Sequence, residues 1–229
     1  GKAQRTSKQQ TEWDRCKADM PYWVNTYCWT FDPRPDDAAQ RHLPFHLYPF
    51  QVEYLGWLEE RYRAGEDGLT EKSRDMGVTW LQLSWDIHHW LFDTAFQSLW
   101  GSRKEDLVDN HKLDSLFGKA EYLIDHLPKW MLPAGWDKRR HRTYMSLVNP
   151  ENGNALIGES ANPDFSRQGR YSVIHLDEFA FWAWAENVWT ATADATRTRF
   201  PISTPNGSNT FQRIRFSGRI KVKTLHWRL

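Results

Sequence analysis

Residues 172–178 read Ser-Val-Ile-His-Leu-Asp-Glu, an apolar run that ends in two adjacent carboxylates, Asp177 and Glu178. The apolar run predicts a buried β-strand. Because side chains alternate along a strand, the two carboxylates point in different directions at its end. In a Walker B site, the first carboxylate reaches the Mg²⁺ shell and the second faces the water that attacks the terminal phosphate. Acids that merely stabilise the start of a helix give the same pattern, so the pair needs a second motif.

The second motif is residues 72–79, which read Lys-Ser-Arg-Asp-Met-Gly-Val-Thr. The usual P-loop, G-x-x-x-x-G-K-[ST], holds phosphates with backbone N–H groups at a helix N-terminus. Gly77 and Thr79 match the second glycine and the hydroxyl that binds Mg²⁺, whereas Lys72 replaces the first glycine and Val78 replaces the lysine. Lys72 or Arg74 would then supply the positive charge. The residues expected around the phosphates are Lys72, Ser73, Arg74, Gly77, Val78 and Thr79. An ordinary polar turn before a helix remains the alternative.

Three further segments carry candidate site residues. In residues 47–51, Leu-Tyr-Pro-Phe-Gln, the amide of Gln51 matches the donor and acceptor pattern of an adenine edge, although the segment also reads as a plain helix start. Residues 201–207, Pro-Ile-Ser-Thr-Pro-Asn-Gly, predict a strand and turn whose Ser203, Thr204 and Asn206 could sense the terminal phosphate. Arg167, in the loop 162–170, is a candidate arginine finger or else a solvated surface residue.

Composition limits the classes of protein that fit the chain. Its 229 residues are 40% hydrophobic and 26% charged, which indicates a globular protein, and no stretch approaches the length of a membrane span. The net charge of +1 means that any DNA contact depends on local patches, such as the basic run 136–142. Cys16 and Cys28 are expected to be buried or half-buried thiols, and the histidines to form no zinc site. Of the 14 tryptophans, core positions are expected for Trp57, Trp80, Trp85 and Trp90.

Helix and strand signals alternate from His46 onward. Apolar periodicity predicts helices near residues 50–62, 79–93 and 112–127, and strands near residues 69–72, 95–100, 143–148, 155–158, 171–176 and 199–203. This alternation predicts an α/β fold with a mostly parallel central sheet and helices on both faces. With the two motifs, it indicates a P-loop NTPase of the ASCE type over residues 45–229. Residues 1–44 are polar and are expected to form an N-terminal arm or small subdomain, with a loop at 32–37.

Taken in order, these motifs resemble the large terminase subunit of tailed phages. The resemblance covers residues 45–229 and includes the displaced lysine, the Arg-x-Gly-Arg loop, Leu-Asp-Glu, Ser-Thr-Pro-Asn-Gly and a closing Leu225-His226-Trp227. It implies an ATPase that uses ATP and Mg²⁺ to drive double-stranded DNA into a procapsid. Glu178 would be the catalytic base, Arg167 the finger acting in a neighbouring subunit, and residues 203–206 the coupling motif.

The resemblance also implies partners and a location. The partners would be double-stranded DNA, the portal protein, the small terminase subunit and further copies of the chain in a ring, in the host cytoplasm at the portal and without a membrane. The nuclease domain of this family has no counterpart here, so nuclease activity is not expected. Two alternatives remain: another P-loop nucleic-acid motor of helicase type, and a catalytically dead module that docks DNA or the portal, which the valine at position 78 would favour.

Overall fold

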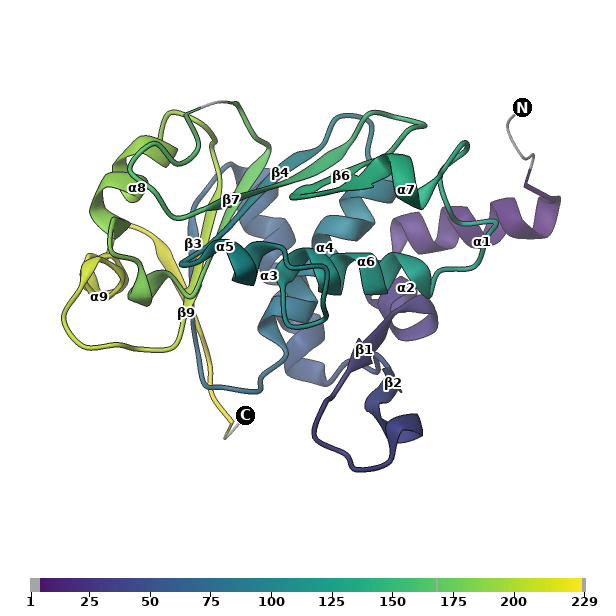
Figure 1. Ribbon diagram of the computed structural model, residues 1–229, viewed down its shortest axis with the longest axis horizontal. Coiled ribbons are helices and arrows are strands. Elements are labelled where there is room, and N and C mark those ends of the chain that lie inside the picture. The colour runs from purple at the N-terminus through teal and green to yellow at the C-terminus, as the bar shows by residue number, and fades with distance from the viewer. Residues whose placement is uncertain (1–4, 168, 228–229) are drawn as a thin grey trace.

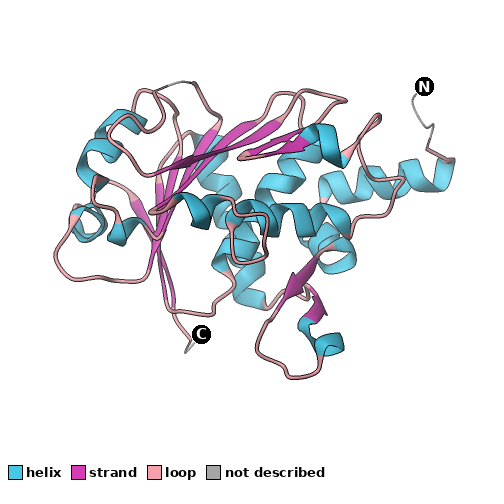
Figure 2. Cartoon of the chain, viewed as in Figure 1, coloured by secondary structure: helices cyan, strands magenta, loops and turns pink. Residues whose placement is uncertain are grey.

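The computed structural model describes residues 5–167 and 169–227, and within them eight strands form one twisted sheet (Figures 1 and 2). In spatial order the strands are β10 (Lys221–Leu225), β3 (Gly68–Lys72), β9 (Arg199–Ser203), β8 (Val173–Asp177), β4 (Gln97–Ser102), β7 (Ala155–Ser160), β6 (Ser146–Val148) and β5 (Arg142–Thr143). The first six strands run parallel, and β6 and β5 continue the sheet antiparallel. The predicted α/β class with a mostly parallel sheet is therefore confirmed. One strand, β9, separates β3 from β8, which is the ASCE arrangement.

Helices cover both faces of the sheet, as predicted (Figure 1). On one face lie α3 (Pro49–Ala64), α4 (Val78–Phe92) and α6 (Leu116–Asp125), and on the other lie η2 (Phe179–Phe181), α8 (Ala185–Thr192) and α9 (Thr210–Phe216). Strand β8 shows why both faces are covered. Val173 belongs to the hydrophobic cluster of the first face, whereas Ile174 and Leu176 belong to that of the second. A strand that is apolar on both sides is stable only between two layers of helices.

The N-terminal residues form helices that the polar sequence did not predict. These are α1 (Ser7–Ala18) and α2 (Met20–Tyr27), followed by the hairpin of β1 (Trp29–Phe31) and β2 (His42–Pro44), with η1 (Ala38–Arg41) in its loop. Cys16, Trp23 and Cys28 are at most 2% exposed and share one hydrophobic cluster with α3 and α4. As predicted, both cysteines are free and buried, and burial raises the pKa of Cys16 to about 12.

Several elements differ from the predictions, including α8 and α9, which were not predicted. Helix α6 begins at Leu116, later than expected, because Ser115 caps it by accepting a 3.1 Å hydrogen bond from the Gly118 amide. A Cβ at Gly118 would lie 1.8 Å from the carbonyl oxygen of Lys112, so only glycine fits against the preceding loop. Strand β10 was not predicted and pairs with the outer side of β3.

The short helices α5 (Glu105–Val108) and α7 (Lys138–His141) lie between β4 and β5 along the chain. The basic run ends just after α7 at the buried Arg142 of β5, which forms an ion pair with Asp109 at 2.8 Å. Part of the predicted basic patch is therefore structural. None of the described helices combines the length and hydrophobicity needed to cross a membrane.

A buried histidine and aspartate join the sheet to α4. On one side of His175, in β8, Nε2 lies 2.8 Å from Oδ1 of Asp86, and on the other, Nδ1 lies 2.7 Å from Oε1 of Gln82. Trp100 of β4 stacks on the His175 ring at 4.1 Å and donates a 2.6 Å hydrogen bond to Oδ2 of Asp86. All four side chains are fully buried. Since Gln82 and Asp86 lie on α4, the contacts attach this helix to β8.

The same network continues to α3 and β3. Gln82 donates a 2.6 Å hydrogen bond to the Tyr54 hydroxyl, which in turn lies 2.8 Å from Oγ1 of Thr70. Tyr54 belongs to α3 and Thr70 to β3. A single buried network therefore connects α3, β3, α4 and β8. These elements carry Gln51, Lys72, Thr79 and Asp177, respectively.

Candidate active site

Three neighbouring parallel strands end at the same edge of the sheet, and each carries a predicted site residue there. Lys72 ends β3, Ser203 ends β9, and Asp177 ends β8. The register confirms the alignment, because Ile202 of β9 lies opposite both Thr70 and Asp177. Nζ of Lys72 lies 3.5 Å from Oε1 of Glu178. The structure therefore brings together the two motifs that are far apart in the sequence.

The loop between β3 and α4 turns through two left-handed residues, Asp75 at φ 61° and Gly77 at φ 70°. Gly77 is the N-cap of α4 and has no side chain to cap it. The first N–H groups of α4 are therefore available to an anion, and Thr79 lies within this first turn. Val78 is only 2% exposed and packs into the core, so the side chain at the usual lysine position contributes no charge.

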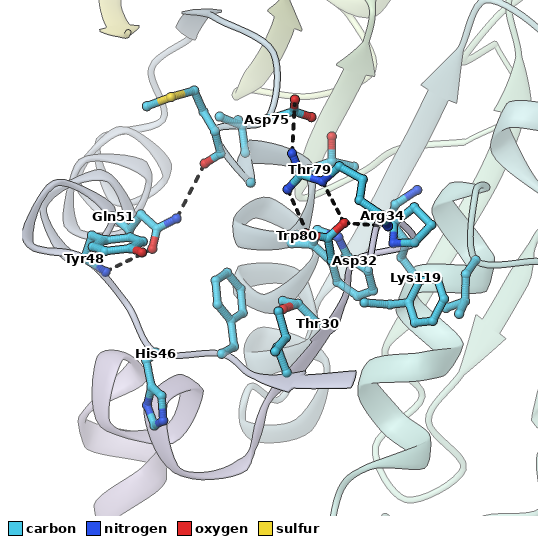
Figure 3. Close-up of a pocket in the computed structure, with 18 of the residues that line it drawn as sticks. Thr30, Asp32, Arg34, His46, Tyr48, Gln51, Asp75, Thr79, Trp80 and Lys119 are labelled. Carbon is cyan, nitrogen blue, oxygen red and sulfur yellow. Dashed lines mark hydrogen bonds and ion pairs between the residues drawn. The ribbon is translucent and has the colours of Figure 1, made fainter. Parts of the chain in front are cut away.

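A cavity of about 1030 Å³ opens in front of this loop (Figure 3). One part of its wall is formed by Lys72, Gly77, Val78 and Thr79, and another by Gln51, Tyr48 and the β1–β2 hairpin. Gln51 is 5% exposed. Its Oε1 accepts a 3.0 Å hydrogen bond from the Tyr48 amide, and its Nε2 donates to the carbonyl of Met76 at 3.5 Å. Gln51 therefore both caps α3 and supports the phosphate loop.

Asp177 is the most perturbed carboxylate of the site. It is 9% exposed, and its Oδ1 has no hydrogen-bond partner in the described structure. Burial raises the pKa of Asp177 to about 6; the positive charges of Lys72 and Lys119 oppose this shift, and the negative charge of Glu178 adds to it. A buried carboxylate oxygen without a donor is a favourable position for a cation.

The residues present fit Mg²⁺ rather than a metal held in an all-protein cage. Oxygen ligands are available from the Asp177 carboxylate and from the Thr79 hydroxyl in the cavity wall. Among residues 5–167 and 169–227, no three His, Cys, Asp or Glu side chains group as a metal site. Mg²⁺ typically takes one or two protein ligands and completes its shell with water and substrate phosphates.

The segment after β9 contacts the turn that follows the two carboxylates. Oγ of Ser203 accepts a 3.2 Å hydrogen bond from the Ala180 amide, and Nδ2 of Asn206 donates to the Ala180 carbonyl at 3.3 Å. Thr204, between them, is half-buried. None of these three residues belongs to the cavity wall as described. The hydrogen bonds of Ser203 and Asn206 connect the end of β9 to the turn that contains Ala180.

Some predicted residues lie apart from the cavity. Arg74 is exposed, and the Ser73 amide donates a 2.9 Å hydrogen bond to Leu225 of β10. Arg167 has a side chain that is 65% exposed and pairs with Asp164 at 2.9 Å. Neither Ser73, Arg74 nor Arg167 is among the residues that form the cavity wall.

Other residues of the cavity wall were missed from the sequence. The β1–β2 hairpin contributes Arg34, which forms two 2.8 Å hydrogen bonds to Asp32 and lies 3.8 Å from Oδ2 of Asp75 in the phosphate loop. Helix α6 contributes Lys119. In the sequence, residues 32–34, Asp-Pro-Arg, indicate only part of a loop. Neither Arg34 nor Lys119 has neighbours along the chain that would place it beside residues 72–79.

No protein-family model matches this chain. Among solved structures, it resembles the large terminase of bacteriophage HK97, with a TM-score of 0.61 and 13% identity over 91% of this chain and 43% of that one. The large terminase of a thermophilic bacteriophage, in complex with ADP, gives a TM-score of 0.54 and 12% identity over 79% and 45%. The UvsW helicase of bacteriophage T4 gives 0.51 and 11% over 97% and 69%.

The chain thus spans less than half the length of either terminase. At these identities the comparison establishes the fold, which is the P-loop ATPase fold shared by phage large terminases and helicases.

Proposed function

We propose that this chain is an ATPase motor domain of the phage large terminase type, which hydrolyses ATP to move double-stranded DNA into a procapsid. The observation that carries the proposal is the junction of the two motifs. Lys72 contacts Glu178 at 3.5 Å, next to a helix N-terminus without a side-chain cap and a buried Asp177 oxygen without a hydrogen-bond partner. Lys72 and the first turn of α4 lie in the cavity wall and would gain an anion from a magnesium triphosphate, and the cation of that ligand would give the Asp177 oxygen a partner.

In this proposal, different residues bind the adenine, the phosphates and the Mg²⁺. Gln51 and the Tyr48 ring bind the adenine end, and Gly77 with the first turn of α4 holds the phosphates. Bound Mg²⁺, held by Thr79 and Asp177, would neutralise charge on the phosphates. Lys72 exchanges its contact with Glu178 for a phosphate oxygen when the nucleotide binds.

Glu178 is the proposed base. Its side chain is 33% exposed, whereas the adjacent Asp177 is buried. Release from Lys72 frees the Glu178 carboxylate to orient the attacking water and to accept its proton. Hydrogen bonds from Ala180 to Ser203 and from Asn206 to Ala180 then give the segment after β9 a route by which hydrolysis alters its position.

The proposed partners rest on the resemblance to large terminases, and the exposure of Arg167 supports a role for it in a neighbouring copy. Because Arg167 lies on the surface away from its own cavity, it would act on ATP bound by a neighbouring copy in a ring. Double-stranded DNA, the portal protein and the small terminase subunit are the further proposed partners, with the motor working in the host cytoplasm at the portal. Residues 1–44 would serve as an arm that closes one side of the site.

Glu178→Gln tests the proposal. ATP turnover, measured with DNA present, should fall by about 10²- to 10⁴-fold, because the proton acceptor is lost, while binding of ATP is retained. Glu53→Gln removes an exposed carboxylate on α3 (side chain 70% exposed) and should leave turnover unchanged. Turnover of the Glu178 variant within about two-fold of wild type would contradict the proposed base. Failure of the wild-type chain to bind ATP with Mg²⁺ in calorimetry would instead favour a docking module.

A helicase is the second candidate, because the likeness to the T4 UvsW helicase covers 97% of this chain. Strand separation on a forked duplex discriminates between the two. A packaging motor should hydrolyse ATP on duplex DNA without separating the strands. ATP-dependent separation of the fork would replace the packaging proposal by the helicase one.

A further inference from the structure

Lys119 lies in the same cavity as the phosphate loop but comes from a different part of the chain. It belongs to the second turn of α6 and is half-buried in the cavity wall with Thr79 and Trp80. In Figure 3, Lys119 and Gln51 lie on opposite sides of the pocket. Lys119 therefore lies on the side of the pocket opposite the proposed adenine-binding residue (Figure 3).

The backbone around Lys119 is closely constrained. The cap from Ser115 and the contact at Gly118, where no Cβ fits, hold the loop 110–114 against the start of α6. In this arrangement Nζ of Lys119 donates a 3.0 Å hydrogen bond to the main-chain carbonyl of Asp114. Within residues 5–167 and 169–227, Lys119 forms no ion pair with a carboxylate. One carbonyl does not replace the hydration of an ammonium group, because a desolvated charge needs a charged partner.

The nearby unsatisfied charge has the opposite sign. Burial lowers the pKa of Lys119, and the negative charges of Asp177 and, less strongly, of Asp114 act against that lowering. The same Asp177 carries the Oδ1 atom without a hydrogen-bond partner. A cation at Asp177 together with an anion at Lys119 would satisfy both groups, and a magnesium triphosphate presents these two charges side by side.

Lys119 also brings a positive charge to the cavity wall beside a loop, residues 72–79, that lacks the usual P-loop lysine. Val78 occupies the usual lysine position and is buried, while Lys72 faces Glu178. Arg34 is held by Asp32 and is 71% exposed. Among these cations, Lys119 is the half-buried one without a carboxylate partner.

We propose that Lys119 binds the terminal phosphate of the nucleoside triphosphate, from the wall of the cavity formed by α6. Lys72 and the first turn of α4 hold the inner phosphates, and Lys119 contacts the group that is present in ATP and absent in ADP. This inference rests on the proposed function, because it assigns a residue to the same nucleotide site.

The test compares affinities for a non-hydrolysable ATP analogue and for ADP, each with Mg²⁺, by calorimetry. Lys119→Ala should weaken analogue binding by about 10- to 100-fold, the range for a lost hydrogen bond to a charged group, while ADP affinity changes less than about two-fold. Lys119→Arg should recover most of the analogue affinity. Lys112→Ala, in the same segment but exposed, is the matched control and should alter neither ligand.

The affinities of the wild type and of Lys119→Ala for the analogue and for ADP distinguish the assignment of Lys119 from the proposed function. Equal loss of analogue and ADP affinity, or no loss of either, overturns the assignment of Lys119 while leaving the proposed function intact. A wild-type chain that binds neither nucleotide overturns both. Should Lys119→Ala melt at a lower temperature than wild type, Lys119→Gln keeps the length of the side chain and is expected to show the same selective loss for the analogue.

Discussion

His175 and Asp177 lie two residues apart on β8 but differ in whether the protein supplies partners for their polar atoms. His175 is fully buried and has both ring nitrogens within hydrogen-bond distance of α4 side chains. Asp177, at the open end of the strand, keeps one carboxylate oxygen without a partner. Side chains two apart on a strand point to the same side, so the difference comes from depth and not from direction.

This difference separates residues that hold the structure from residues that bind. Polar groups inside the network are satisfied by the protein itself, which attaches α3, β3 and α4 to β8. Two charges, that of Lys119 in the cavity wall and that of Asp177 at the end of β8, are only partly satisfied, which costs stability unless a ligand completes them. Substitutions inside the network and at the cavity should therefore differ in the size and the sign of their effect on stability.

The largest effect is expected inside the network. Asp86→Ala should lower the free energy of unfolding by about 3–5 kcal/mol, because it leaves a buried His175 and the Trp100 N–H without their partner. Urea denaturation followed by tryptophan fluorescence measures this. Asp164→Ala, whose side chain is 75% exposed, should change the value by less than about 0.5 kcal/mol. A loss at Asp86 as small as that control would mean that the network does not hold the elements together.

The second effect should have the opposite sign. Asp177→Asn should stabilise the protein by about 1–3 kcal/mol at pH 7 while abolishing ATP turnover, since it removes a buried charge that only a bound cation compensates. The raised pKa of Asp177 means that the wild type regains this stability as pH falls from about 6 toward 4. The gain of the variant should therefore shrink in acid. A less stable variant at pH 7 would show that Asp177 has a structural partner.

The third effect concerns a second buried histidine, His89 of α4, which lies 2.9 Å from Glu59 and 2.8 Å from Asp93. Burial opposes ionisation of all three groups. The hydrogen bonds outweigh it: they raise the pKa of His89, lower that of Glu59 to about 2, and also lower that of Asp93. The stability from the acids is lost as pH falls below about 4.5, and that from the histidine as pH rises above 6.5.

His89→Gln should therefore cost most between these two pH values, by about 1–2 kcal/mol, with a smaller cost on either side. Denaturation of both proteins across a pH series gives the difference directly. A cost that does not vary with pH would show that His89 contributes by packing alone.

The smallest effect is expected at the surface. Arg213 pairs with Glu186, but the two side chains are 61% and 55% exposed. Arg213→Ala should change the free energy of unfolding by less than about 1 kcal/mol, and the change should fall further in high salt. Arg199→Ala, at the half-buried pair with Asp67, is the comparison and should cost more. An equal loss in the free energy of unfolding for Arg213→Ala and Arg199→Ala would show that burial does not decide how much an ion pair contributes.

The sequence predicted most strands of the central sheet and the helices α3, α4 and α6 from local signals. Apolar residues 173–176 predicted β8 because a strand apolar on both sides lies between two helical layers, and the acids after it marked the open edge. Gly77 and Thr79 marked the helix start in the same way. These signals are local: each depends on residues that are neighbours along the chain.

Only the tertiary structure decided which residues share the cavity. Arg34, Lys119 and the pair of Asp86 with His175 carry no local signal, because their partners lie far along the chain. The packing of α1 and α2 and the pairing of β10 with β3 depend equally on distant residues. A buried charge that lacks a partner in the folded protein is available to bind a ligand, whereas one with a partner holds the structure together. Whether a charge has a partner depends on residues that are distant along the chain and come together only when it folds.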